Sequence, residues 1–206
     1  MIRDSQDLKR YEPKERANHW VVGISFILLA LSGLAFFHPA FFPLTQLFGG
    51  PTWTRILHPY VGALMALSFL ALFLRFKHLN KMTPVDKEWL NKVGQMVDGD
   101  DHNMPEQGKY NGGQKVMFWA LAVCMLLMTV SGLFIWRAWF GFDITLVRLG
   151  TVVHAATAAV MIGLIMVHVY AAIWVKGTIR AMWYGTVTRG WAKQHHRGWY
   201  RQVTGK

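Results

Sequence analysis

The chain has 206 residues, of which 53% are hydrophobic and 14% aromatic, and its formal net charge is +11. A chain of this length suits one or two soluble domains, but its apolar residues gather in four long uncharged runs, which excludes an ordinary soluble core. Cys124 is the only cysteine, and it lies inside the third run. A lone thiol excludes an internal disulfide and a metal site built from cysteines, so we expect Cys124 to act as a small packing residue.

The four runs predict membrane-spanning helices, because they are 18 to 27 residues long and a bilayer core needs about 20 apolar residues. We therefore expect an all-α integral membrane protein, a four-transmembrane-helix bundle that forms a single domain over residues 1–206. The expected spans are residues 20–37, 56–76, 115–136 and 149–175. Residues 77–114 then form a loop with a short helix over 84–97, and residues 176–206 form a tail.

The basic residues are divided unequally among the connecting segments. Nineteen of the 22 lie before the first run, between the second and third runs, or after the fourth, whereas the other two connections hold only Arg55, Arg137 and Arg148. Since cytoplasmic segments carry the excess of lysine and arginine, both termini are expected in the cytoplasm. Topology and attraction to anionic lipid account for the charge, so no nucleic-acid partner is expected.

Two histidines interrupt the fourth run, and a titratable residue inside a membrane indicates a functional site. His154 and His168 are fourteen residues apart, which is about 21 Å along a helix. Fourteen residues fall about 40° short of four full turns, so both side chains point to nearly the same face. One metal ion cannot bridge that distance. The helix therefore offers one ligand to each of two sites, one near each membrane surface.

Two further histidines lie at matching depths. His58 begins the second span on the outer side, and His19 begins the first span on the inner side. If each site is a six-coordinate haem with a histidine above and below, the pairs are His58 with His154 and His19 with His168. The alternative is that all four are polar helix-packing residues, but four histidines at two matched depths favour two haems.

The remaining histidines compete for these roles. His38 precedes Pro39 in a connection, where an interfacial position is expected. His78 lies twenty residues after His58 and so falls on roughly the opposite face of that helix. Three more are in polar segments and are expected to be solvated: His102, His195 and His196. In the tail, RGWAKQHHRGWYRQ, we expect the tryptophans and tyrosine to anchor the chain at the membrane surface.

Six segments, in order along the chain, are similar to those of a known family: ERANHW, RILHP, GKYNGGQK, SGLFIWR, HVYAAIWVKGTI and RGWAKQHHRGWYR. Over nearly its whole length the chain resembles the cytochrome b (gamma) subunit of respiratory formate dehydrogenase. The resemblance implies a four-helix membrane cytochrome with two haem b groups. It implies the same ligand pairs, His58 with His154 for the outer haem and His19 with His168 for the inner haem.

The resemblance also implies partners and an electron path. Electrons would come from a periplasmic iron–sulfur beta subunit, linked to a molybdenum- or tungsten-containing alpha subunit that oxidises formate, and would leave to menaquinone or ubiquinone on the cytoplasmic side. The resemblance further implies a trimer of heterotrimers in the bacterial inner membrane. By itself GKYNGGQK is typical of a glycine turn before a membrane helix. With the resemblance, Asn111, Gly113 and Gln114 become candidates to line the quinone pocket.

Three other functions remain to be weighed. The closest alternative is the same scaffold serving a hydrogenase or another periplasmic oxidoreductase. A haem-free transporter with a histidine relay is disfavoured, because no Asp, Glu, Lys or Arg lies in the cores of the four runs. A passive membrane anchor would have no use for paired histidines. We therefore expect the quinone-reducing electron-transfer subunit of an oxidoreductase complex, with formate oxidation on a partner subunit.

Overall fold

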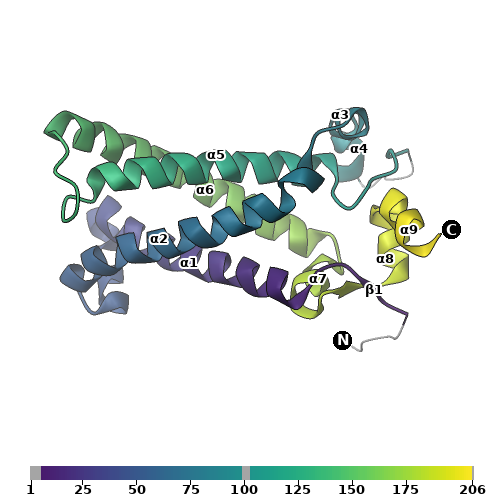
Figure 1. Ribbon diagram of the computed structural model, residues 1–206, viewed down its shortest axis with the longest axis horizontal. Coiled ribbons are helices and arrows are strands. Elements are labelled where there is room, and N and C mark those ends of the chain that lie inside the picture. Colours follow the sequence, from purple (N-terminus) through teal and green to yellow (C-terminus); the bar gives the residue numbers. More distant parts are fainter. Residues whose placement is uncertain (1–5, 99–102, 206) are drawn as a thin grey trace. The chain divides into compact units, whose positions relative to one another are not determined.

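The computed structural model describes residues 6–98 and 103–205. In this part of the chain four long helices carry the four apolar runs (Figure 1), and each is long and apolar enough to cross a membrane. They are α1 (Pro13–Phe37), α2 (Pro51–Phe76), α5 (Gly112–Ile135) and α6 (Ile144–Trp174). The prediction of a helical, multi-pass membrane protein with four spanning helices is confirmed. Each helix begins a few residues before the predicted span and ends within a residue of it.

The early starts have a local cause, because the helices begin at residues that favour a first turn. α1 and α2 begin at Pro13 and Pro51, and proline suits the first helical position since it has no N–H to leave unpaired. Before α6, the Asp143 carboxylate accepts hydrogen bonds from the backbone N–H groups of Thr145 and Leu146. Start signals of this kind lie outside the apolar runs.

A ten-residue 3-10 helix, η1 (Pro39–Phe48), connects α1 to α2. The ring of His38 caps it by accepting a hydrogen bond from the backbone of Ala40. Thr45 and Thr54 are fully buried, and the Thr54 hydroxyl donates to the Thr45 carbonyl, which ties η1 to the start of α2. The turn between them is Gly49–Gly50, with φ values of 85° and 98° that favour glycine.

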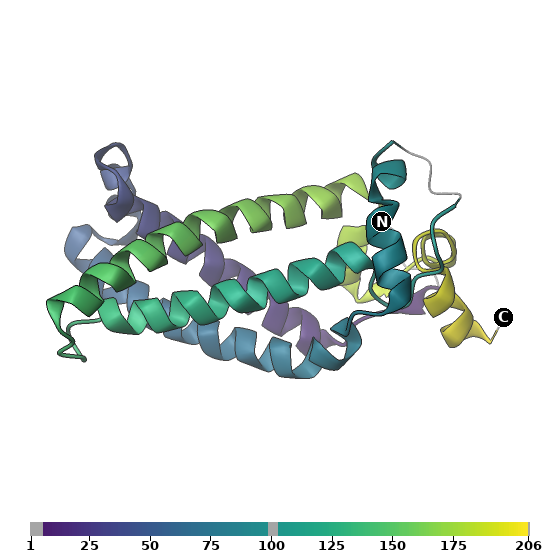
Figure 2. The same cartoon turned by 90° about the horizontal axis from the view of Figure 1, so that it is seen from above.

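The shorter elements precede, connect or follow the long helices along the chain. After α2 come η2 (Lys77–Asn80), α3 (Pro84–Asn91) and α4 (Val93–Val97), so the helix expected over 84–97 is present as two shorter ones. The other elements, traced in Figures 1 and 2, are β1 (Leu8–Lys9), α7 (Thr178–Tyr184), β2 (Thr186–Val187), α8 (Arg189–His195) and α9 (Arg197–Thr204).

The chain divides into two compact units. The bundle unit comprises residues 17–74 and 121–167. The terminal unit comprises the described residues among 1–16, 75–120 and 168–206. That the whole chain acts as a single domain stays a prediction.

The core of the bundle unit is small and made of soft side chains. Met65, Cys124, Met125 and Met161 are buried together, so Cys124 is a packing residue, as expected. Most other large apolar side chains of the spanning helices are exposed. A helix that is apolar all round and exposed within its own chain is suited to a lipid environment.

The terminal unit has a conventional water-excluding core around a two-stranded antiparallel sheet. Leu8 of β1 pairs with Val187 of β2, and Val187 is buried with the tryptophans of α8 and α9, Trp191 and Trp199. The expectation that these two tryptophans anchor the tail at the membrane surface is therefore wrong. They pack inward because the N-terminal segment provides an apolar partner, Leu8 and Tyr11, some 180 residues earlier in the chain.

Candidate functional site

The imidazole rings of His58 and His154 face one another in the bundle unit. His58 lies in the second turn of α2 and His154 in the third turn of α6. Their ring centroids are 6.3 Å apart, and the ring planes are inclined by 65°. Both side chains are half-buried. The structure thus brings together the two residues that the sequence pairs at the outer side.

The spacing of the two rings fits an iron bound between them. An imidazole nitrogen binds a metal ion at about 2 Å and lies roughly 1 Å from the centre of its own ring, so two rings on opposite sides of one ion have centres about 6 Å apart. The observed 6.3 Å agrees with this distance. Within residues 6–98 and 103–205 no cluster of three or more His, Cys, Asp or Glu forms a metal site. Two protein ligands therefore suit a haem, whose porphyrin supplies the other four donors.

Each of these rings is held at its Nδ1 atom by a buried serine of a neighbouring helix. Ser32 of α1 lies 2.7 Å from Nδ1 of His58, and Ser131 of α5 lies 3.0 Å from Nδ1 of His154. Metal-bound histidines commonly use their second ring nitrogen in this way. With Nδ1 so engaged, Nε2 is the nitrogen available to a metal.

A glycine follows each serine, and the ring packs beside it at ordinary van der Waals distance. A Cβ atom on Gly33 would meet Cε1 of His58 at 3.5 Å, and one on Gly132 would meet Cε1 of His154 at the same distance. The signal for these contacts was present in the sequence, as Ser-Gly-Leu at 32–34 and again at 131–133. The spacing of the histidines does not by itself identify the serines.

The second predicted pair is divided between the two units. His19 lies in α1 within the bundle unit, whereas His168 lies in α6 within the terminal unit. The ring of His19 contacts Trp20 edge to face, with centroids 5.7 Å apart. The pairing of His19 with His168 therefore stays a prediction.

The other histidines have different positions. His38 caps η1 and is exposed. His78 is exposed in η2 rather than on the far face of α2, and His195 is half-buried. The expectation that His196 is solvated is wrong, since only 1% of its surface is exposed. His102 lies outside the described residues.

The GKYNGGQK segment forms the start of α5. The Asn111 side chain accepts a hydrogen bond from the backbone of Gln114, and the Gln114 side chain accepts one from the backbone of Asn111, at 2.9 and 3.1 Å. This reciprocal pair is a capping box. A Cβ atom on Gly113 would lie 3.0 Å from the Trp89 ring, so glycine permits α3 to pack against α5. Both amide oxygens are used by the cap, and the two NH2 groups are left to donate elsewhere.

Three consecutive carbonyls, that of Gln107 and those of the first two residues of this segment, are bound by distant parts of the chain. The carbonyl of Gln107 accepts from the backbone N–H of Trp199 at 3.1 Å. The carbonyl of Gly108 accepts from Nδ1 of His196 at 2.8 Å, and that of Lys109 accepts from the Arg10 guanidinium. We call this arrangement the terminal clasp: Arg10, His196 and Trp199 on residues 107–109.

Arg10 is the centre of the clasp. It is 5% exposed, and its guanidinium lies 4.9 Å from the ring centre of Trp191 and 4.8 Å from that of Trp199. It also approaches Nε2 of His196 at 3.2 Å. Burial and the neighbouring Arg10 charge lower the pKa of His196 to about 3. The imidazole is therefore neutral at physiological pH.

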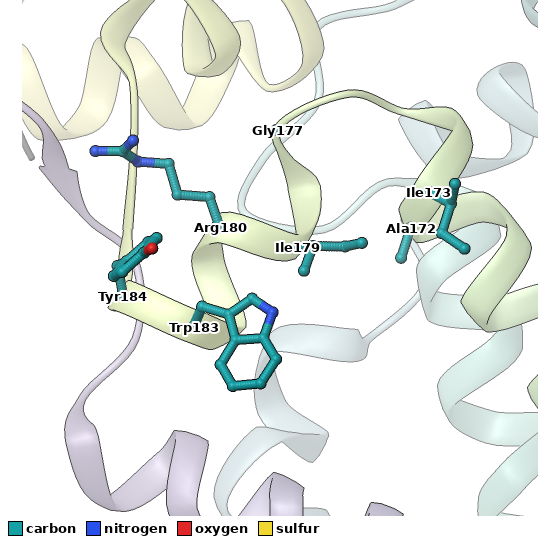
Figure 3. Close-up of a pocket in the computed structure, with 7 residues that line it drawn as sticks. All are labelled: Ala172, Ile173, Gly177, Ile179, Arg180, Trp183 and Tyr184. Atoms are coloured by element: carbon teal, nitrogen blue, oxygen red, sulfur yellow. The ribbon is translucent and has the colours of Figure 1, made fainter. Parts of the chain in front are cut away.

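A cavity of about 420 Å³ lies in the terminal unit at the junction of α6 and α7. Figure 3 shows its lining residues, Ala172, Ile173, Gly177, Ile179, Arg180, Trp183 and Tyr184. The predicted haem and quinone residues do not line this cavity.

Comparison with known proteins gives a consistent result. The model of the prokaryotic cytochrome b561 family matches residues 10–185. The chain is 45% identical over 196 residues to the formate dehydrogenase cytochrome b556(fdo) subunit of Escherichia coli K12, covering 94% of this chain and 92% of that protein. It is 42% identical to the nitrate-inducible cytochrome b556(Fdn) subunit of the same strain, over 92% of this chain and 88% of that one.

A third relative is the formate dehydrogenase cytochrome b556 subunit of Haemophilus influenzae, 38% identical over 94% of this chain and 82% of that protein. The resemblance noted in the sequence is thus confirmed along almost the whole chain. One assignment follows from the four apolar helices, the two neighbouring imidazoles and these matches. The chain belongs to the prokaryotic cytochrome b561 family, whose members are haem b membrane proteins.

Proposed function

We propose that this chain is the dihaem cytochrome b subunit of a respiratory formate dehydrogenase in the bacterial inner membrane. The observation that carries the proposal is the pair of facing rings, His58 and His154, 6.3 Å apart with both Nδ1 atoms engaged by serines. The relatives support the partner enzyme, since those compared are named as cytochrome subunits of formate dehydrogenase.

In this proposal the chain's own residues hold and orient the haem groups, and haem, when bound, supplies the one-electron chemistry. His58 and His154 hold the outer haem, and His19 and His168 hold the inner one. The small, apolar bundle core around Met65 and Met161 excludes water between the sites. Electrons pass to the haems from an iron–sulfur beta subunit, which receives them from a molybdenum- or tungsten-containing alpha subunit. The complexes assemble as a trimer of heterotrimers.

The quinone is placed at the start of α5, on the cytoplasmic side. Asn111 and Gln114 use their side-chain oxygens in the capping box, which leaves two amide NH2 groups to donate to a quinone carbonyl. Gly113 keeps the backbone close to Trp89 and so maintains the local shape. The excess of basic residues in the same segments supports this orientation, with both termini in the cytoplasm. Menaquinone or ubiquinone is the acceptor.

A second candidate is the same role in a hydrogenase or another periplasmic oxidoreductase. It is favoured by the breadth of the family model, which describes prokaryotic cytochromes b561 rather than formate dehydrogenase subunits alone. Reduction of the haems by formate, but not by hydrogen, in the complete complex distinguishes the two.

The order of the two sites tests the proposal as a whole. Two b haems per chain are expected from pyridine haemochrome analysis. In the complete complex, His154→Ala should remove the outer haem and leave the inner one oxidised when formate is supplied. His168→Ala should remove the inner haem, while the outer one is still reduced by formate and then stays reduced.

The retained haem in each variant is the control for misfolding. A single haem per chain would contradict the two-site proposal. The direction of electron flow would be wrong if the His168 variant blocks reduction of its remaining haem while the His154 variant does not.

A further inference from the structure

The serines beside the two facing histidines each have a second hydrogen bond, and it determines how they interact with the ring. The hydroxyl of Ser32 lies 2.7 Å from the carbonyl of Leu28, and that of Ser131 lies 2.6 Å from the carbonyl of Leu127. A carbonyl only accepts, so the single hydroxyl proton of each serine is donated along its own helix. Toward the histidine, each serine oxygen is therefore an acceptor.

This arrangement defines the protonation of both rings. An accepting oxygen at Nδ1 requires Nδ1 to carry the proton, which leaves the Nε2 lone pair free. Ser32 and Ser131 are each 3% exposed, so water does not compete for these bonds.

We propose that Ser32 and Ser131 are positioning residues that hold His58 and His154 as Nδ1–H tautomers, with Nε2 directed at one haem iron, and that they lower the reduction potential of that iron. The proposal rests on the proposed function only in assigning haem to these histidines. A hydrogen bond donated from Nδ1 makes Nε2 more basic. A more basic ligand favours the ferric over the ferrous state, so the haem is harder to reduce.

The two serines form a matched set, one for each side of the same site. In α1 and again in α5, a Ser-Gly-Leu sequence holds the histidine of the long helix that follows, α2 or α6. The geometries agree as well, with ring-to-serine distances of 2.7 and 3.0 Å and equal approach of the glycines. Loss of either serine should therefore act on the same redox centre and in the same direction.

The test is a potentiometric titration of the haem absorption bands in the complete complex, with wild-type, Ser32→Ala and Ser131→Ala chains. Both variants should shift the same one of the two transitions to higher potential and leave the other unmoved. Haem retention at that site should also fall, by about tenfold. Ser32→Thr and Ser131→Thr keep the hydroxyl and should restore both properties.

Thr129→Ala is the matched control. Thr129 is two residues before Ser131 in α5, and its hydroxyl also donates to the carbonyl four residues earlier, that of Met125, at 2.7 Å. It differs from Ser131 in having no contact with His154 among those the structure describes. A general effect of removing a helix hydroxyl would appear in this variant, and we expect none.

The outcomes separate this inference from the proposed function. Unshifted potentials in alanine variants that keep both haems would overturn the role of the serines and leave haem ligation standing. Shifts of two different transitions would show that His58 and His154 do not share an iron, which would overturn the pairing. If an alanine variant loses the haem entirely, recovery of haem at near-native potential in the threonine variant supports the inference, and no recovery overturns it.

Discussion

The bundle unit and the terminal unit bury polar groups in opposite ways. In the bundle, the hydroxyls of Ser32 and Ser131 donate to backbone carbonyls of their own helices, four residues earlier. In the terminal unit, by contrast, Arg10 and His196 bind the carbonyls of Lys109 and Gly108, 99 and 88 positions away along the chain. A helix in lipid must meet its hydrogen bonds locally, whereas a segment in water can build a core from distant pieces. The difference means that the terminal unit should be the more sensitive to single polar substitutions.

The largest expected effect is at the buried ion pair of the terminal unit, Lys115 with Asp86, 2.7 Å apart. Burial raises the pKa of Asp86, but hydrogen bonds from Lys115 and Thr83 outweigh it and hold the pKa below its ordinary value. Lys115→Met leaves this carboxylate buried without its partner. The free energy of unfolding of the terminal unit should fall by about 3–5 kcal/mol, as measured by native-state proteolysis in increasing urea.

The control is Lys92→Met, which removes a pair of equal length with Glu88 whose side chains are 34% and 52% exposed. An exposed helix pair contributes about 0.3–0.5 kcal/mol, so that variant should unfold almost like the native chain. Equal losses in the two variants would show that the buried pair is no more important than the exposed one.

An intermediate effect is expected from pH, again confined to the terminal unit. The pKa of His196 is about 3 in the folded chain and near 6.5 when unfolded, so between these values the unfolded state binds more protons. The free energy of unfolding of the terminal unit is therefore highest above pH 6.5 and falls as the pH is lowered toward 3. The expected loss between pH 7 and pH 5 is about 2 kcal/mol. The groups facing His196 are Arg10, His195 and the Gly108 carbonyl.

His196→Asn is the test of this pH dependence, since the asparagine amide can still donate to Gly108 but does not titrate. Its terminal unit should unfold at the same urea concentration at pH 5 and pH 7. A native-like pH slope in the asparagine variant would assign the dependence to another group.

The smallest effect on stability is expected at the cap of α5. Asn111→Ala removes one hydrogen bond of the capping box and should lower the free energy of unfolding by about 1 kcal/mol. In the proposed site it should also slow quinone reduction, because the NH2 group of Asn111 no longer donates to the quinone carbonyl. Thr83→Ala removes the capping box of α3 at a similar cost and is the matched control. Steady-state kinetics with a short-chain naphthoquinone should differ between the two variants, with donor-driven haem reduction unchanged in both. Equal quinone kinetics would remove Asn111 from the pocket.

Much of the bundle was predictable from the sequence, because span length and histidine depth follow from one-dimensional spacing. The four helices and the proximity of His58 to His154 were both expected from residue counts along the chain. The pairing of His19 with His168 rests on the same reasoning and stays a prediction. The serines were missed because each contacts a histidine on another helix, and spacing within one helix does not show such a contact.

The terminal unit was largely not predictable, for a physical reason. A polar, tryptophan-rich tail has the same composition whether it rests on a membrane surface or packs against an N-terminal strand. The position of the tail depends on whether the N-terminal segment packs against it. Leu8, Arg10 and Tyr11 gave no local signal of pairing with residues near 190. His196, expected in solvent, is buried by the same partners.

The terminal clasp has a consequence for the synthesis of the chain. β1 is synthesised well before its partner β2, which lies at Thr186–Val187, and Trp199 is later still. Contacts between residues so distant in sequence form late and slowly. The spanning helices can therefore insert while the first residues still lack their core. The carbonyls of Gln107 and Gly108 acquire their donors only when Trp199 and His196 are made, so maturation of the segment before α5 awaits the synthesis of these residues.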